Sequence, residues 1–156
     1  MTLDQLLPPE RTLFDVKGGS KKRVLEFFST FIAQNIPSLD DQEVFSRLIG
    51  RERLGSTGVG NGVAIPHARN PHCKVPVASF IRLAEPIDFD AIDGEPVDLI
   101  FVLLVPEEAE DTHLTLLGQI AELLNDSDNR HTLRNTHSQR ELHETLVDLI
   151  AQQQKA

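Results

Sequence analysis

The sequence predicts an α/β fold of three layers, in which a mixed β-sheet of about five strands lies between layers of helices. Stretches with helical periodicity come before, between and after β-prone stretches, which is typical of a sheet covered on both faces. Residues 99–105 are all apolar without alternation, which indicates a strand buried on both faces. The 156 residues, 40% of them hydrophobic, fit one core, so we expect a single domain over residues 1–156.

In the N-terminal half, the pattern predicts one strand and two helices. Residues 11–16 are rich in β-prone side chains and precede a Gly-Gly turn signal. Ser20 is a suitable N-cap for a first helix, whose phenylalanines we expect in the core. Ser38 and Asp41 have the spacing of a capping box, which predicts a second helix that ends near Leu54.

The C-terminal half contains further strands and helices after a glycine-rich loop at residues 55–62. The pattern predicts a short β-prone run at residues 63–65 and two longer strands at residues 75–83 and 97–105. Between the two longer strands, residues 87–90 are predicted to form an edge strand or a turn. A long helix is predicted to begin at Thr112 and to be broken at residues 126–130. A short helix is predicted at residues 132–135. Ser138 and Glu141 form a capping box that predicts the start of the last helix.

The composition excludes several classes of function. The formal net charge is −9, and because nucleic-acid backbones require a basic face, we expect no nucleic-acid partner. No apolar run approaches the ~20 residues of a membrane helix, and the first ten residues lack the pattern of a secretory signal. Cys73 is the only cysteine, which excludes an internal disulfide and a thiolate zinc cluster. These features favour a cytoplasmic protein without membrane insertion.

The charge is unevenly distributed along the chain. Residues 51–74 contain four basic residues and one acidic residue, so they form a small positive segment in an acidic protein. Residues 85–111 contain ten acidic residues and no basic one, which we interpret as solvated surface.

The glycine-rich loop does not fit the common phosphate-binding motifs. No lysine occurs between Lys22 and Lys74, so a Walker loop is absent, and Gly62 comes one position too early for the dinucleotide fingerprint. The chain also lacks a Gly-x-Ser-x-Gly nucleophile elbow. We therefore expect tight turns that let another group approach the backbone closely.

His67 is the strongest candidate for chemistry. Pro66 restricts the backbone before it, so the histidine should project from a constrained strand end. A neutral imidazole is a nucleophile at physiological pH, and the nearby cations would suit an anionic phosphoryl group. These cations are Arg51, Arg53 and Arg69.

The other histidines give weaker signals. A metal site built from His67, His72, Cys73 and His113 matches no standard zinc spacing, so we expect no metal. The remaining histidines are expected to be solvated, namely His131, His137 and His143.

Two segments carry a family resemblance. Residues 51–69 read Arg-Glu-Arg-Leu-Gly-Ser-Thr-Gly-Val-Gly-Asn-Gly-Val-Ala-Ile-Pro-His-Ala-Arg and resemble the active-site segment of the fructose and mannitol class of enzyme IIA in the bacterial phosphotransferase system. Residues 97–106 and 111–117 resemble the second signature of that family. The resemblance extends over nearly the whole chain and implies one type 2 IIA domain with a mixed sheet between helical layers.

The resemblance implies a phosphoryl carrier that uses neither a cofactor nor a metal. It implies that His67 accepts the phosphoryl group from a histidine phosphocarrier, that His113 helps to hold the group, and that Arg51 offsets its charge. Ser56 and Thr57 match loop hydroxyls near the site.

Two details concern the surroundings of this histidine. Ala68 stands where the family often has glycine, which affects the local backbone shape. We also expect an apolar collar around the histidine, with Ile65 and Val59 as candidates.

Within the family, residues 54–62 and a chain without an attached IIB domain favour the nitrogen-regulatory branch. This branch implies regulation of nitrogen and potassium metabolism through the phosphorylation state, with partners such as potassium transporters and sensor kinases. Two alternatives stay open, namely a sugar-transport IIA that passes phosphate to a IIB domain and a binding module in which His67 is never phosphorylated.

Overall fold

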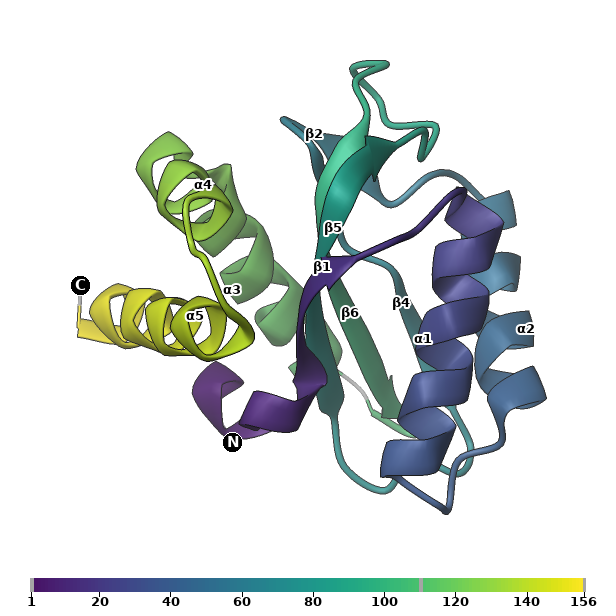
Figure 1. Cartoon of the computed structure of the whole chain (residues 1–156). Coiled ribbons are helices and arrows are strands. Elements are labelled where there is room, and N and C mark those ends of the chain that lie inside the picture. Colours follow the sequence, from purple (N-terminus) through teal and green to yellow (C-terminus); the bar gives the residue numbers. More distant parts are fainter. Residues whose placement is uncertain (1, 110, 156) are drawn as a thin grey trace.

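The computed structural model describes residues 2–109 and 111–155. Six strands within these residues form one mixed sheet, which agrees with the predicted sheet between helical layers (Figure 1). The strand order is β1-β5-β6-β3-β2, and β4 also pairs with β6. The strands are β1 (Thr12–Val16), β2 (Gly58–Gly60), β3 (Val63–Ala64), β4 (His67–Asn70), β5 (Val77–Ile87) and β6 (Val97–Pro106).

The sheet is built around the antiparallel pair β5 and β6, in which Phe80 lies opposite Phe101. β1 runs parallel to β5, and both β3 and β4 run parallel to β6. Residues 99–105 of β6 are all buried, which confirms the predicted strand that is covered on both faces.

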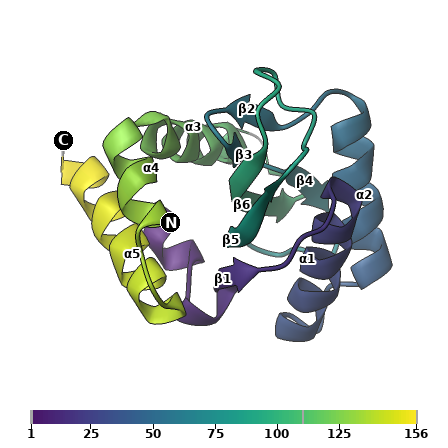
Figure 2. The ribbon, with the colours of Figure 1, turned by 45° about the horizontal axis from the view of Figure 1, so that its top comes forward.

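The helices cover both faces of this sheet, as the two views in Figures 1 and 2 show. α1 (Lys21–Asn35) and α2 (Asp41–Arg53) pack on one face, around one hydrophobic cluster. The other face carries a second cluster, formed with three α-helices and the first of two short 3₁₀ helices; the second 3₁₀ helix has no buried residue. These are η1 (Leu3–Leu6), η2 (Pro9–Arg11), α3 (Thr112–Asn125), α4 (Ser127–Arg134) and α5 (Gln139–Lys155).

Two of the predicted helix caps are present and one is wrong. The backbone N–H of Arg23 donates to the Ser20 hydroxyl at 3.2 Å, and Glu141 donates in the same way to Ser138 at 3.0 Å. The cap of α2 is Asp40 instead of Ser38, because the carboxylate of Asp40 accepts the third N–H of the helix at 3.0 Å. A carboxylate at this position also interacts favourably with the helix dipole.

The predicted break at residues 126–130 is present but confined to Asp126. Asp126 alone is extended, and its carboxylate accepts the backbone N–H groups of Asp128 and Asn129 at 2.8 and 3.2 Å. Asp126 interrupts the helical pattern because it is the N-cap of the next helix. α4 therefore starts at Ser127 and not at Thr132.

Two expectations about single side chains are also wrong. Phe27 is 42% exposed and stacks on Phe31 with the ring centroids 6.4 Å apart, because it lies beside the core-facing stripe of α1. His143 is half-buried, and its Nε2 donates to the carbonyl of Leu7 at 2.8 Å. This histidine joins α5 to the N-terminal segment instead of facing solvent.

The glycine-rich loop forms a β2–β3 hairpin in which Asn61 and Gly62 have positive φ values of 59° and 78°. The guanidinium of Arg134 occupies the space that a Cβ of Gly62 would fill. It donates to the carbonyl of Asn61 at 2.8 Å and pairs with Asp98 at 2.8 Å. The group that approaches this backbone closely is therefore a side chain of α4.

Across the described residues, no helix combines the length and apolar character that a bilayer requires.

Candidate functional site

His67 lies at the start of β4, where two short strands follow one another along β6. Val63 pairs with Leu99, and His67 pairs with Leu103. Pro66 falls between them, and its carbonyl accepts the backbone N–H of Leu103 at 3.0 Å. The histidine thus begins a second paired strand, and its backbone is fixed on both sides.

The imidazole of His67 has a defined hydrogen-bond partner. Its Nδ1 lies 2.8 Å from the carbonyl oxygen of Ile65, which can only accept. The ring therefore carries its proton on Nδ1, and Nε2 keeps a free lone pair. Burial lowers the pKa of His67, and the charges of Arg51 and His113 act in the same direction, against the raising effects of the Ile65 hydrogen bond and of Glu52. The neutral, nucleophilic ring is the favoured form.

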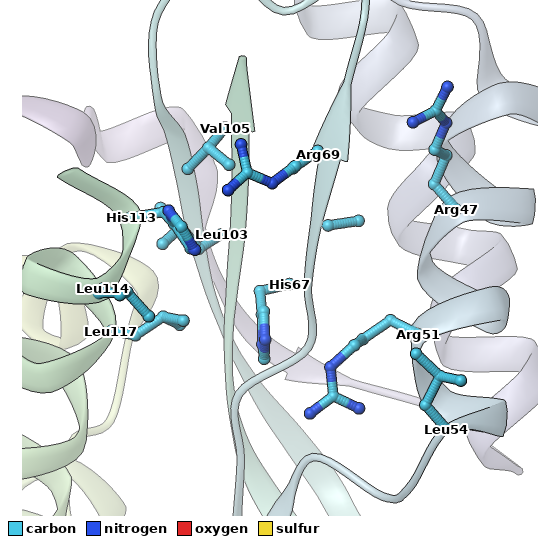
Figure 3. Close-up of a pocket in the computed structure, with 11 residues that line it drawn as sticks. Arg47, Arg51, Leu54, His67, Arg69, Leu103, Val105, His113, Leu114 and Leu117 are labelled. Carbon is cyan, nitrogen blue, oxygen red and sulfur yellow. The ribbon is translucent and has the colours of Figure 1, made fainter. Parts of the chain in front are cut away.

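His67 opens into a cavity of about 320 Å³ between α2, β4, β6 and α3. Figure 3 shows His67 at its centre, with Arg51 extending from α2 on one side and His113 and Leu117 on the other. The cavity is lined by Arg47, Arg51, Leu54, His67, Ala68, Arg69, Leu103, Val105, His113, Leu114 and Leu117. Three arginines and two histidines thus meet an apolar wall, and none of the lining residues is acidic.

The arginines of α2 supply positive charge to this cavity. Arg51 donates to the carbonyl of Gly55 at 2.8 Å, which holds its guanidinium near the start of the loop. Arg47 also lines the cavity and pairs with Glu43 and Glu107 at 2.9 and 3.3 Å. Arg47 is not among the residues predicted from the sequence, although its spacing of four residues from Arg51 places both on one helix face.

Arg69 lines the cavity as well, but its hydrogen bonds go to the backbone. Its guanidinium donates to the carbonyls of Glu107, at 3.0 Å, and of Ala109. These residues belong to the segment that leads from β6 to α3, so Arg69 fixes the approach to His113. Arg53 is exposed and is not among the lining residues.

His113 lies in the first turn of α3 and is half-buried. Its Nδ1 is buried without a hydrogen-bond partner among the described residues, which leaves Nε2 as the nitrogen that can hydrogen-bond to a group in the cavity. The structure therefore brings His67, His113 and Arg51 to one cavity, although Arg51 and His113 are 62 positions apart in the sequence.

The apolar part of the cavity differs from the predicted collar. Val59 is 53% exposed and lines a different cavity, against α3, and the side chain of Ile65 points into the core. In a regular strand, residues i and i+2 face the same side, but Ile65 and Pro66 lie between β3 and β4 and belong to neither, so this relation does not hold between Ile65 and His67. The apolar wall comes instead from β6 and α3, through Leu103, Val105, Leu114 and Leu117.

The hydroxyls of Ser56 and Thr57 face the protein. Ser56 donates to the carbonyl of Phe89 at 2.6 Å, and Thr57 donates to the carboxylate of Glu52 at 2.5 Å. Neither residue lines the cavity, so both act within the loop.

The site has the features of a nucleophilic centre without a metal cluster. In the described ranges, 2–109 and 111–155, no three His, Cys, Asp or Glu side chains are grouped so that they could hold a metal ion. A free imidazole lone pair, nearby cations and a partly apolar opening suit the covalent attachment of a small anionic group.

Comparisons with known proteins identify the family of this chain. Residues 5–148 match the family described as the phosphoenolpyruvate-dependent sugar phosphotransferase system, EIIA 2. The chain is 50% identical to a nitrogen regulatory protein of Pseudomonas aeruginosa over 147 residues, which are 94% of this chain and 96% of the relative. The corresponding protein of Escherichia coli K12 is 42% identical over 95% of this chain and 91% of its own length.

A solved structure shows the same fold at high similarity. Nitrogen regulatory protein IIA-Ntr from Neisseria meningitidis superposes with a TM-score of 0.86 and 42% sequence identity, covering 92% of this chain and 98% of the other. The fold, the cavity around His67 and the matched residues lead to one assignment. The chain belongs to the EIIA 2 family of the phosphotransferase system and to its nitrogen-regulatory members.

Proposed function

We propose that His67 accepts a phosphoryl group on Nε2 from a histidine phosphocarrier in a phosphoenolpyruvate-dependent relay. The Nε2 lone pair forms the new N–P bond while the donor's N–P bond breaks, and its electron pair returns to the donor's nitrogen. The observation that carries this proposal is the hydrogen bond from Nδ1–H to the carbonyl of Ile65, at 2.8 Å. It leaves Nε2 free and stabilises the positive charge that phosphorylation places on the ring.

The other cavity residues act on charge and position. Phosphoryl transfer passes through a loose transition state whose charge is spread over the equatorial oxygens, so catalysis depends on positioning and charge stabilisation. Arg51 supplies a cation from α2, and His113 supplies a hydrogen bond from α3. No step requires a metal or a cofactor.

The phosphorylation state then regulates partner proteins of nitrogen and potassium metabolism, such as a potassium transporter or a sensor kinase, in the cytoplasm. One type 2 IIA domain over residues 1–156 carries this function. The nitrogen regulatory relatives, matched over 94% and 95% of this chain, support this proposal over sugar uptake.

The test is the intact mass after incubation with phosphoenolpyruvate, enzyme I and the histidine phosphocarrier. We expect one acid-labile phosphoryl group on the wild type and none on His67→Ala, with the fold of the variant unchanged by circular dichroism. No addition to the wild type with any cognate donor would contradict the proposal and favour the binding module.

A further inference from the structure

Glu52 is a buried carboxylate that the proposed transfer does not use. It lies in the last turn of α2, its side chain is 4% exposed, and it is not among the residues that line the cavity. Burial of a carboxylate is costly unless the group is paired and hydrogen-bonded. Its location therefore requires an explanation.

Both oxygens of Glu52 have partners. Lys21 Nζ lies 2.9 Å from Oε1, and the backbone N–H of Thr57 donates to the same oxygen at 3.1 Å. The hydroxyl of Thr57 donates to Oε2 at 2.5 Å. Hydrogen bonds to a charged acceptor are stronger than those between neutral groups. Two such bonds from one residue fix Thr57 to the end of α2.

Thr57 is bonded in turn to the segment that carries the nucleophile. Its carbonyl accepts the backbone N–H of Ile65 at 3.0 Å, and the carbonyl of Ile65 accepts Nδ1–H of His67 at 2.8 Å. Three successive hydrogen bonds thus join Glu52 to the imidazole. A displacement of Thr57 would move the carbonyl that orients the ring.

We propose that Glu52 is a positioning residue for His67, which acts through Thr57 and Ile65 to keep the ring proton on Nδ1 and Nε2 free. The kinetic consequence rests on the proposed phosphoryl transfer, whereas the tautomer can be measured in the protein alone. The carboxylate also acts through space, because it raises the pKa of His67 against the larger lowering effect of burial.

The direct test is ¹⁵N NMR of the His67 ring nitrogens in the unphosphorylated protein. The wild type should show the Nδ1–H tautomer. In Glu52→Gln and Thr57→Val, the two ring signals should move toward the average of the two tautomers, and Thr57→Ser should restore the wild-type signals. Thr57→Val keeps the test valid if Glu52→Gln fails to fold.

Thr136→Val is the matched control. Thr136 is a buried threonine whose hydroxyl donates to the carbonyl of Leu133 at 2.9 Å, between α4 and α5. Its substitution removes a buried hydroxyl of the same kind without breaking the connection to His67. A tautomer shift as large in Thr136→Val as in Thr57→Val would overturn the proposal, as would a wild-type tautomer in folded Glu52→Gln and Thr57→Val.

A kinetic measurement extends the test to phosphoryl transfer. Thr57→Val and Glu52→Gln should lower kcat about 10-fold, because the nucleophile is misaligned. KM for the phosphocarrier should stay nearly constant, because neither residue lines the cavity that the donor meets. If the variants show altered tautomers but the wild type accepts no phosphoryl group, the positioning role of Glu52 is supported and the proposed function is refuted.

Discussion

The pKa of His67 sets the pH range in which its ring is neutral and available for the proposed phosphoryl transfer. Burial lowers this pKa below the ordinary value of 6.5, so the ring stays neutral at mildly acidic pH. An NMR titration should give a midpoint below 6.5, and phosphoryl acceptance should persist until the pH falls through that midpoint. A midpoint at or above 6.5 would contradict the burial argument.

The same shift has a defined sign for stability. The pKa of His67 is lower in the folded state than in the unfolded state, so the unfolded chain binds the proton more readily. The contribution of His67 to the free energy of unfolding is complete above pH ~6.5 and decreases as the pH falls through that value toward the folded pKa.

Cys73 should be inert in the native protein. Burial raises the pKa of its thiol to about 11 from an ordinary 9, which leaves ~100-fold less thiolate at neutral pH. Alkylation by iodoacetamide should therefore be about 100-fold slower in buffer than in urea, as measured by intact mass. Equal rates in both solvents would show that the β4–β5 connection opens readily.

Among the elements, the connection from β6 to α3 depends on β4. Arg69 donates to the carbonyls of Glu107 and Ala109, so Arg69→Met should release this segment and misplace His113. We expect phosphorylation to slow by about 10- to 100-fold, as rapid-quench kinetics would measure. Arg140→Met is the control, because Arg140 forms an exposed pair with Glu144 on α5 and should leave the rate unchanged. Equal rates in the wild type and both variants would show that Arg69 does not position His113.

The elements also show what a sequence can and cannot predict. α1 and α5 follow from apolar periodicity and the local caps at Ser20 and Ser138, and β6 follows from its continuous apolar run. The strand β4 was not predicted, because four residues form a strand only where β6 offers them a partner. Asp40 and Ser38 are equally good caps by type, and the packing of the chain decides between them.

The site divides in the same way. His67, His113 and Arg51 could be named from two sequence motifs, and the structure brings them to one cavity. The partners of Arg69 could not be predicted, because they are carbonyl groups on another part of the chain. The partner of Thr57 could not be predicted, because its hydroxyl faces the protein instead of the cavity. Hydrogen bonds to carbonyl groups and a buried carboxylate leave no pattern in the sequence.

At the scale of the whole molecule, the two hydrophobic clusters share the central strands β5 and β6. Leu146→Ala removes a fully buried side chain of α5, on the face opposite α1 and α2, and should lower the free energy of unfolding by ~2–5 kcal/mol. Because the clusters share strands, the variant should still unfold in one transition.

Urea denaturation followed by far-UV circular dichroism measures this effect, since the chain contains no tryptophan or tyrosine. Phosphorylation per folded molecule should match the wild type, because α5 does not line the His67 cavity. Two separate transitions would show that the helical layers fold independently of each other.

The pairing of β3 and β4 along β6 has a thermodynamic consequence for the proposed phosphoryl transfer. A histidine on an unstructured peptide loses the rotational entropy of its side chain and backbone at every encounter with a donor. In this protein, the carbonyl of Pro66 accepts a hydrogen bond from the backbone N–H of Leu103, and Nδ1–H of His67 donates to the carbonyl of Ile65. The imidazole therefore loses this entropy once, when the chain folds, which would make the activation entropy of each proposed transfer less unfavourable.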